Sequence, residues 1–293
     1  MLLDKLLLSL ATAGEFDSAA VAGMGGAGVA NGQDTTSIQR SPAAMLLDVG
    51  YTGQSEFHFS LADGPLVGGT VSVMDTRTSN FGAGVTTSRQ WSNVPPPDDE
   101  LPGWKEKGAE FSDKRWEQTW RLAMGYGVLR RQVLNNQGSY NDMRRLAFGG
   151  SVVYGRTVSE LSGNLNTWEF DASVAGRPHA IVSVAATVHG IGDMGSEETW
   201  GEAGVYLTPG RWAFAADGLY RPLSTEDPYG FRGGAQVQVD TALIRAGVAL
   251  DEGAWRGTAG LGIASEGVRM DYALGWTVAN NTFDHGIGFY GEF

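Results

Sequence analysis

The sequence contains no cysteine, and it contains no apolar stretch as long as a membrane-spanning helix requires. The missing cysteine excludes disulfide scaffolds, thiolate metal sites and thiol catalysis. Because a spanning helix needs about 20 mainly apolar residues in a row, a helical membrane protein is excluded as well. Positive charge is also scarce, since the formal net charge of the 293 residues is −12. No nucleic-acid partner is therefore expected, because binding to phosphates needs a basic surface.

Lysine is almost absent. Lys5, Lys105, Lys107 and Lys114 are the only lysines, and arginine supplies the rest of the 21 basic residues. Glycine, by contrast, occurs 43 times, and 42% of the residues are hydrophobic, which is enough for a sizeable core. The composition predicts a folded chain with one large domain or two small ones.

Apolar side chains recur at every second position from about residue 49 onward. Near the C-terminus, for example, Val268, Met270 and Tyr272 alternate with Arg269 and Asp271. A period of two is typical of a β-strand with one apolar and one polar face. Such segments predict about fourteen strands of about ten residues, long enough to cross a bilayer at a tilt. They are 49–61, 66–76, 80–90, 116–129, 144–155, 165–176, 180–190, 199–208, 211–221, 231–240, 242–251, 255–264, 268–278 and 285–293.

The connections between these segments tend to alternate in length. Short turns, such as 177–179 and 240–241, are interspersed with longer connections, such as 191–198 and 222–230. This asymmetry is typical of outer-membrane barrels, which have short periplasmic turns and longer outer loops. The connection 130–145 is long where a short turn is due, and there we expect a small helix or hairpin.

Charged residues on the polar faces favour a barrel over a soluble β-sandwich or propeller, in which strands alternate as well. No predicted strand contains lysine, and a narrow lumen must pair its charges, for which the planar guanidinium of arginine suits carboxylates better. The expected lumenal charges are Arg232, Arg245, Arg256, Arg269, Asp171, Asp217, Asp240 and Asp271. We expect them to stabilise the barrel by ion pairing, and the alternative is contact with a ligand carboxylate.

Aromatic residues cluster toward the ends of the predicted strands, as in the girdles of membrane barrels. The last strand contains Gly288 and Phe289 and ends at Phe293. This pattern resembles the C-terminal assembly signal of bacterial outer-membrane proteins, although Gly291 stands where that signal prefers an aromatic or aliphatic residue.

A glycine-rich block precedes the first predicted strand. Residues 23–28 match the Gly-x-Gly-x-x-Gly pattern of dinucleotide-binding folds, and Asp48 lies about twenty residues further on. Such a site also needs a helix after the glycines, and residues 31–36 together with Pro42 interrupt any helix here. A dinucleotide site is therefore not expected.

The block resembles instead the N-terminal block of the FadL superfamily of long-chain fatty-acid outer-membrane transporters, which includes PorV-like and TraF-like barrels. The resemblance covers about residues 22–47, with Ser41 in place of the asparagine of the family. The residues that carry it are Gly23, Gly25, Gly26, Gly28, Asp34, Ser41 and Pro42. It implies a fourteen-stranded barrel at 48–293 and a plug formed by 14–47 inside it. Residues 1–13, which end in small side chains, are expected to be a signal-peptide remnant.

The predicted fold is therefore an all-β, transmembrane, antiparallel barrel of about fourteen strands with an N-terminal plug, in the cell outer membrane. The resemblance implies passive uptake or carriage of hydrophobic, fatty-acid-like small molecules. The alternative is a structural or docking barrel of an envelope secretion or motility machine, as in PorV-like relatives, without transport. The expected partners are outer-membrane lipids, a hydrophobic small molecule or an envelope protein, and the barrel-assembly machinery.

The histidines do not suggest a metal site or an active site. The four of them, His58, His179, His189 and His285, lack the spacing of metal ligands. Asp284 beside His285 and Asp193 near His189 are the pairs that a barrel enzyme would use, but a histidine at a strand end is usually structural. We expect no catalytic residue, no metal and no cofactor.

Overall fold

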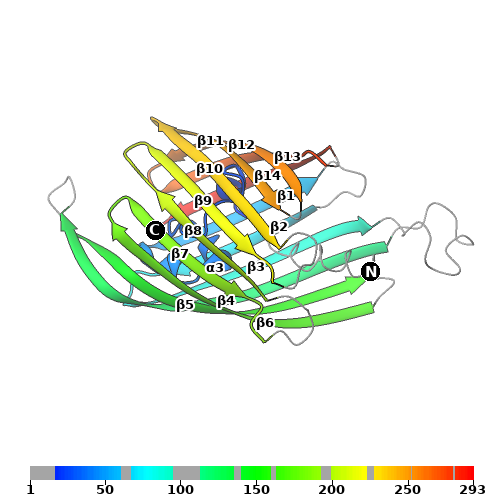
Figure 1. The fold of residues 1–293 in the computed structure, drawn as a ribbon, viewed down its shortest axis with the longest axis horizontal. Coiled ribbons are helices and arrows are strands. Elements are labelled where there is room, and N and C mark those ends of the chain that lie inside the picture. Colours follow the sequence, from blue (N-terminus) through cyan, green and yellow to red (C-terminus); the bar gives the residue numbers. More distant parts are fainter. Residues whose placement is uncertain are drawn as a thin grey trace, which may run out of the picture.

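The computed structural model describes residues 17–60, 67–94, 113–134, 140–159, 163–192, 199–222, 228–251, 253–279 and 281–293, and the expected signal-peptide remnant at 1–13 lies outside them. Within these ranges, fourteen antiparallel strands form one closed barrel (Figure 1). Each strand pairs with its neighbours along the chain, and β1 pairs with β14 to close the ring. The strands are β1 (Tyr51–Ser60), β2 (Val67–Asp75), β3 (Phe81–Val94), β4 (Asp113–Leu134), β5 (Tyr140–Ser159), β6 (Gly163–His179), β7 (Val182–His189), β8 (Trp200–Leu207), β9 (Trp212–Tyr220), β10 (Tyr229–Val239), β11 (Ala242–Asp251), β12 (Ala254–Ser265), β13 (Val268–Thr277) and β14 (Thr282–Glu292).

The fourteen strands confirm the strand number predicted from the period of two. Every predicted segment corresponds to one strand, and β11 has the predicted bounds, 242–251. Within 130–145, β4 and β5 continue past their predicted ends as paired strands, and Leu134 pairs with Tyr140. Of the helix and the hairpin expected there, the described residues form the hairpin. A closed single sheet also rules out the sandwich and the propeller.

The tight turns fix the ends of the strands and decide the position of one predicted lumenal residue. Asp240 lies in the turn between β10 and β11 with a φ of 52°, and its side chain is exposed. Aspartate tolerates this left-handed conformation better than most residues. The expectation that Asp240 is a lumenal charge is therefore wrong.

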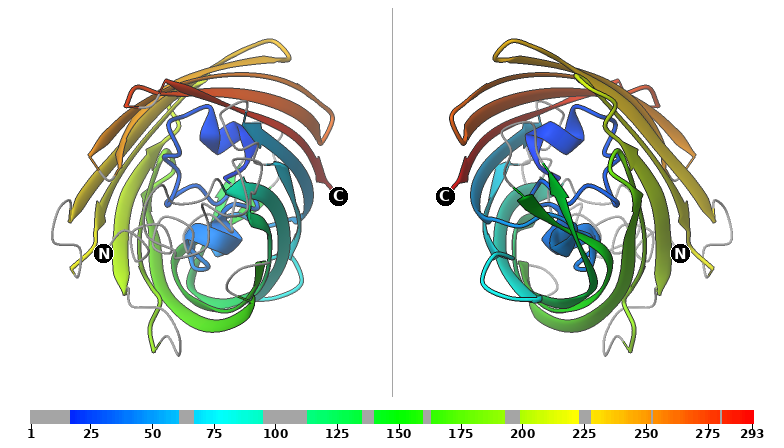
Figure 2. Two further views of the ribbon diagram at one scale, coloured as in Figure 1. Left: turned by 90° about the vertical axis from the view of Figure 1, so that its right-hand side faces the viewer. Right: turned by 90° about the vertical axis from the view of Figure 1, so that its left-hand side faces the viewer.

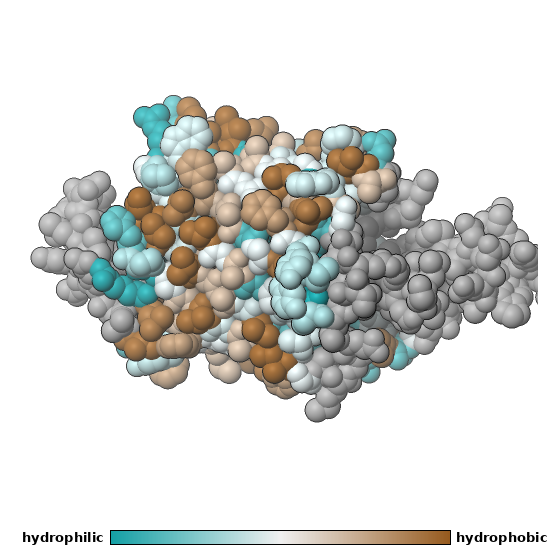
Figure 3. Space-filling view, viewed as in Figure 1, coloured by the Kyte–Doolittle hydropathy of each residue, from teal (hydrophilic) through white to brown (hydrophobic). Residues whose placement is uncertain are grey.

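The two faces of the barrel wall have opposite chemistry. On β13, Val268 is 61% exposed on the outside, whereas Asp271 is 1% exposed on the inside. The outer face carries large apolar side chains, and Figure 3 shows them spread over the described part of one side of the molecule. The inner face carries small, polar and charged residues. This arrangement inverts that of a soluble protein and leaves a broad apolar surface uncovered.

The N-terminal segment, residues 17–48, lies inside the ring of strands (Figure 2). It contains the short helices α2 (Ala19–Ala22) and α3 (Ser37–Arg40) and the 3₁₀ helix η1 (Ala44–Leu47). None of the described helices is long and apolar enough to cross a membrane. Apolar residues of the segment, such as Ile38 and Leu46, are fully buried against alanines of the wall and form the core.

Candidate functional site

The N-terminal segment is seated on glycines of the inner wall. Gly234 of β10 and Gly247 of β11 face each other across the two strands. A Cβ atom on Gly247 would lie 2.7 Å from the carbonyl oxygen of Met24 and still closer to the amide nitrogen of Gly25. Side chains cannot approach backbone atoms so closely, so these strand glycines create the space that the segment occupies.

A second glycine contact holds the other end of the segment. A Cβ atom on Gly149 of β5 would lie 2.5 Å from the amide nitrogen of Ala43 and 2.6 Å from the carbonyl carbon of Pro42. The Ala43 amide donates a hydrogen bond of 2.8 Å to Ser173 Oγ on β6. Ser41, beside Pro42, is fully buried. The predicted plug residues Ser41 and Pro42 therefore lie against the wall.

The glycines of the N-terminal block make the turns that follow α2. Gly25 and Gly26 have φ angles of 74° and 76°, which residues with a side chain rarely adopt. The Gly25 amide donates a hydrogen bond of 2.8 Å to Thr258 Oγ1, and the Thr258 hydroxyl donates one of 3.2 Å to the Gly23 carbonyl. The Gly28 amide donates one of 2.6 Å to Asp217 Oδ2. The backbone polar groups of the segment are thus partly satisfied by wall side chains.

Asp34 ties the segment to β13 through a chain of charges. Its Oδ2 atom is 2.9 Å from Arg269 Nη2 and accepts a hydrogen bond of 3.0 Å from Ser18 Oγ. Arg269 also contacts Asp271 on the same strand, and Asp271 Oδ1 is 2.7 Å from Arg245 Nη1. Arg245 and Arg269, two of the predicted arginines, thus both contact Asp271. Asp34, the acidic residue of the N-terminal block, contacts Arg269 as well.

Arg40 makes the second charged link. Its guanidinium lies 2.7 Å from Asp17 within the segment and 3.3 Å and 3.7 Å from Glu202 and Asp217 of the wall. Burial alone would raise the pKa of Asp17, but the attraction of Arg40 and of Arg232 outweighs burial and holds that pKa below its ordinary value. Burial alone would lower the pKa of Arg40, and its three carboxylate neighbours raise it instead.

The other predicted charges find partners that differ from those expected. Asp171 contacts Arg121 and accepts a hydrogen bond of 2.6 Å from Ser151. Arg232 lies 2.9 Å from Asp251. Arg256 is partly exposed and lies 3.3 Å from Asp284. The predicted ion pairing of the lumen is present, but the partners Arg121, Asp251 and Asp284 were not among the predicted charges.

Several residues that make lumenal contacts were not among the predicted site residues. Glu202 and His189 face the lumen, and their side chains are 3.3 Å apart. Arg177 holds Asp48, just after η1, with two hydrogen bonds of 2.8 Å and 2.9 Å. Alternation within β8 marks Glu202 as inward facing. Asp48 follows the short helix η1 in an irregular stretch, which has no period.

The histidines have separate surroundings. His189 lies between Asp171 and Glu202 and stacks on Trp200, and it is buried. His285 accepts or donates a 2.7 Å hydrogen bond with Tyr272 on the other face of the wall. Asp193, which the sequence places near His189, lies outside the described residues. No cluster of three or more potential metal ligands occurs in the described part of the chain.

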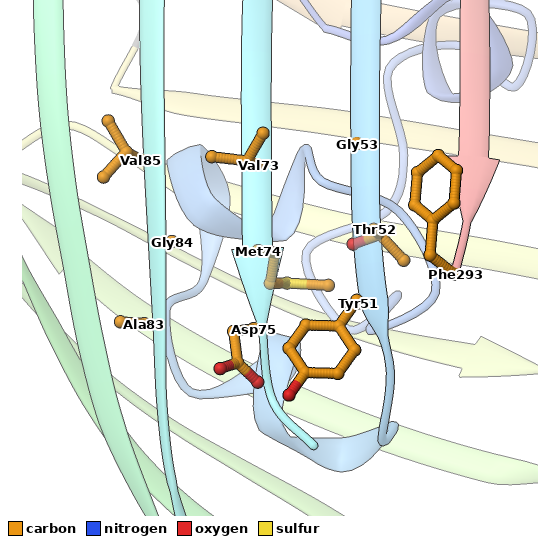
Figure 4. Close-up of a pocket in the computed structure, with 10 residues that line it drawn as sticks. All are labelled: Tyr51, Thr52, Gly53, Val73, Met74, Asp75, Ala83, Gly84, Val85 and Phe293. Atoms are coloured by element: carbon orange, nitrogen blue, oxygen red, sulfur yellow. The ribbon is translucent and has the colours of Figure 1, made fainter. Parts of the chain in front are cut away.

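An apolar hollow of about 350 Å³ lies on the wall where β1, β2 and β3 meet the C-terminus (Figure 4). Its outward-facing lining includes Tyr51, Val73, Val85 and Phe293. The backbone amide of Phe293 donates a hydrogen bond of 2.9 Å to the Tyr51 carbonyl. Of the residues predicted as an assembly signal, Phe289 and Phe293 thus face outward, and Gly288 faces Glu56 in the lumen.

Comparison with solved structures finds similar barrels. The CymD monoaromatic hydrocarbon channel is 12% identical, with 94% of this chain and 97% of that chain covered and a TM-score of 0.66. The toluene transporter TbuX of Ralstonia pickettii is 10% identical, with 96% and 99% covered and a TM-score of 0.65. A FadL homologue of Pseudomonas aeruginosa is 10% identical, with 93% and 96% covered and a TM-score of 0.63.

These matches confirm that the fold is that of the FadL-like barrels. Their coverages and TM-scores show a shared fold over nearly the whole chain, and at these low identities the likeness extends to the fold alone. Two of the three are named as a channel and a transporter rather than as enzymes. No family model matches the sequence, and no curated protein matches it.

Proposed function

We propose that the protein is an outer-membrane barrel that takes up hydrophobic small molecules passively, with residues 17–48 as its plug. One observation carries the proposal. A closed barrel, apolar outside and occupied inside by its own N-terminal segment, has the fold of a transporter that is named for toluene and of a channel that is named for monoaromatic hydrocarbons. We extend that substrate class, hydrophobic small molecules, to this chain.

The outer face supports placement in a membrane. On neighbouring strands, Phe81 pairs with Tyr126, and ten residues further toward the loop end Trp91 pairs with Trp116. Ten residues of strand, tilted by about 40°, span about 25 Å across a bilayer. This is the height of the apolar band of an outer-membrane barrel, and the aromatic pairs stand where its two girdles belong.

The plug determines which molecules can pass. The segment fills the lumen between the glycines of β10 and β11 on one side and of β5 on the other, and ion pairs fix it to the wall. A wide aqueous path along the barrel axis is therefore not proposed. Hydrophobic molecules need a route that involves the apolar wall, and the hollow beside Phe293 is the described surface whose chemistry suits them.

We interpret the lumenal charges as anchors of the plug. Asp34, Asp217 and Asp271 all have arginine or backbone partners, so their charges are already compensated. A ligand carboxylate would have to displace one of these aspartates from its partner, and breaking a buried ion pair costs about 3–5 kcal/mol. Stabilisation is therefore preferred over ligand binding as the role of these residues.

Mass spectrometry of the detergent-purified protein tests the proposal. We expect a co-purifying fatty acid or hydrocarbon, and the loss of its signal when Val73→Arg places a charge in the apolar hollow. Phe81→Arg, at an exposed apolar site outside the hollow, serves as the control for a charge on the outer face. A persistent protein partner without any lipid would favour the docking barrel instead. A chain that migrates identically on a gel before and after boiling and fractionates as soluble would refute membrane placement.

A further inference from the structure

A row of polar side chains crosses the outer face of four strands near their loop ends. Arg89 of β3 pairs with Gln118 of β4, Gln118 pairs with Arg156 of β5, and Arg156 pairs with Asn166 of β6. Both arginines are exposed. We call these four residues the arginine row.

Both guanidinium groups lie against one tryptophan. The Arg89 guanidinium carbon is 4.8 Å from the ring centre of Trp91 and 4.9 Å from that of Trp116, and that of Arg156 is 5.4 Å from Trp116. These two rings occupy the next outward position toward the loop end, since Trp91 pairs with Trp116. The cation–π contacts therefore direct both positive charges toward the loop end and hold them near each other.

The described residues supply no negative charge to the arginine row. Among the residues that the structure describes, no carboxylate forms an ion pair with Arg89 or Arg156. The lumenal arginines differ in this respect, since Arg245 and Arg269 both contact Asp271. Two guanidinium groups on one ring, with no described carboxylate beside them, form a fork-shaped site for an anion with several oxygens.

Apolar and aromatic rows lie directly below the arginine row. The rings of Trp120, Tyr154 and Trp168 form a row across β4, β5 and β6. Trp120 stacks on Tyr154 at 5.9 Å between ring centres, and Trp168 contacts Tyr154 at a tilt, with ring centres 4.8 Å apart. The next row toward the turn end consists of Leu122, Val152 and Phe170. Leu122 pairs with Val152, and Val152 pairs with Phe170. An anion bound at the arginine row would thus have an apolar wall beneath it, long enough for acyl chains.

We propose that the arginine row binds the phosphate of an anionic lipid headgroup while the rows below it contact the acyl chains. The inference rests on the proposed placement in a membrane. The charge selects phosphate, which accepts two parallel hydrogen bonds from a guanidinium. The apolar rows select a lipid over free phosphate. The amides of Gln118 and Asn166 add donors at the same level, and Tyr154 donates a hydrogen bond of 2.9 Å to Asn166 Oδ1, which orients that amide.

Native mass spectrometry of the detergent-solubilised protein, titrated with dioctanoyl phosphatidic acid, measures this site. The double variant Arg89→Gln/Arg156→Gln should bind the lipid at least about tenfold more weakly than the wild type, because both charge-assisted contacts are lost. The matched control is Arg77→Gln/Arg211→Gln, which removes two exposed arginines at the turn end and should bind like the wild type. Dioctanoylglycerol, which lacks the phosphate, should bind weakly to all three proteins.

Two results would overturn the inference. One is equal binding of phosphatidic acid by the two double variants. The other is displacement of the lipid by inorganic phosphate at equal concentration, which would indicate a site for free phosphate. A gel shift on boiling, measured for each variant, shows that the barrel has formed. A wild-type protein that shows no such shift would refute the membrane placement itself, so the two failures are distinguishable.

Discussion

Substitution of Gly247 by alanine tests whether the plug is seated on glycines. The added Cβ atom would lie 2.7 Å from the Met24 carbonyl oxygen, whereas ordinary contacts are 3.4–4 Å. The segment would therefore have to retreat by about 1 Å, and such overpacking costs about 1–3 kcal/mol. The retreat also weakens the hydrogen bond from the Gly25 amide to Thr258, worth about 1 kcal/mol. Together, these costs destabilise the seated segment by about 2–4 kcal/mol.

The absence of native cysteine gives a clean assay. A single cysteine in place of Val29, which is fully buried, reports each release of the segment by its reaction with a maleimide. A cost of about 2 kcal/mol predicts labelling at least about 30-fold faster in the Gly247→Ala background. The control is Gly257→Ala, because a Cβ atom there meets nothing within 4 Å. Equal labelling rates in the two backgrounds would refute the seating of the segment on this glycine.

Three further predictions concern the charges and the C-terminus. Asp34→Asn leaves Arg269 with one carboxylate instead of two and should destabilise the seated segment by about 1–3 kcal/mol, so that the same cysteine is labelled faster. An unchanged labelling rate would show that this pair does not hold the plug. Because the pKa of Asp17 is lowered in the folded protein, its pair with Arg40 stabilises the protein fully above the ordinary pKa of aspartate, near pH 4, and loses this effect as the pH falls further. The thermal midpoints of the wild type and Asp17→Asn should therefore differ at pH 6 and converge on acidification, and a difference that grows on acidification would contradict the assignment. Phe293→Ala removes an 80% exposed ring and should lower the yield of heat-modifiable barrel in membranes, whereas equal yield would argue against an assembly signal.

The strands and their number could be predicted from the sequence because the environment imposes them. Each strand has one face toward an apolar exterior and one toward a lumen, so side chains such as Met270 and Asp271 must alternate. The predicted strand 242–251 contains Gly247, one of the glycines that accept the segment. Their partner along the chain, Met24, was not identifiable, because close approach of distant backbones leaves no local pattern.

The ion pairs could be predicted only as a class. Arginine on an inward face must find an acid, but the register of the strands does not identify which one. Arg232 stands opposite Asp217 in the pairing of β9 with β10, yet its guanidinium contacts Asp251 of β11. Asp240 fits the alternation and yet lies in a turn, since a two-residue connection needs a residue that tolerates positive φ. Arg40 was missed because it lies in the four-residue helix α3, which is too short to show a period.

Uptake by cells tests the central proposal most directly. Cells whose outer membrane contains the protein should take up radiolabelled toluene or oleate faster than cells that lack it, while uptake of a disaccharide should not change, because the plug fills the lumen. Equal uptake of the hydrophobic compounds with and without the protein, or faster uptake of the disaccharide, would contradict a plugged barrel for hydrophobic molecules.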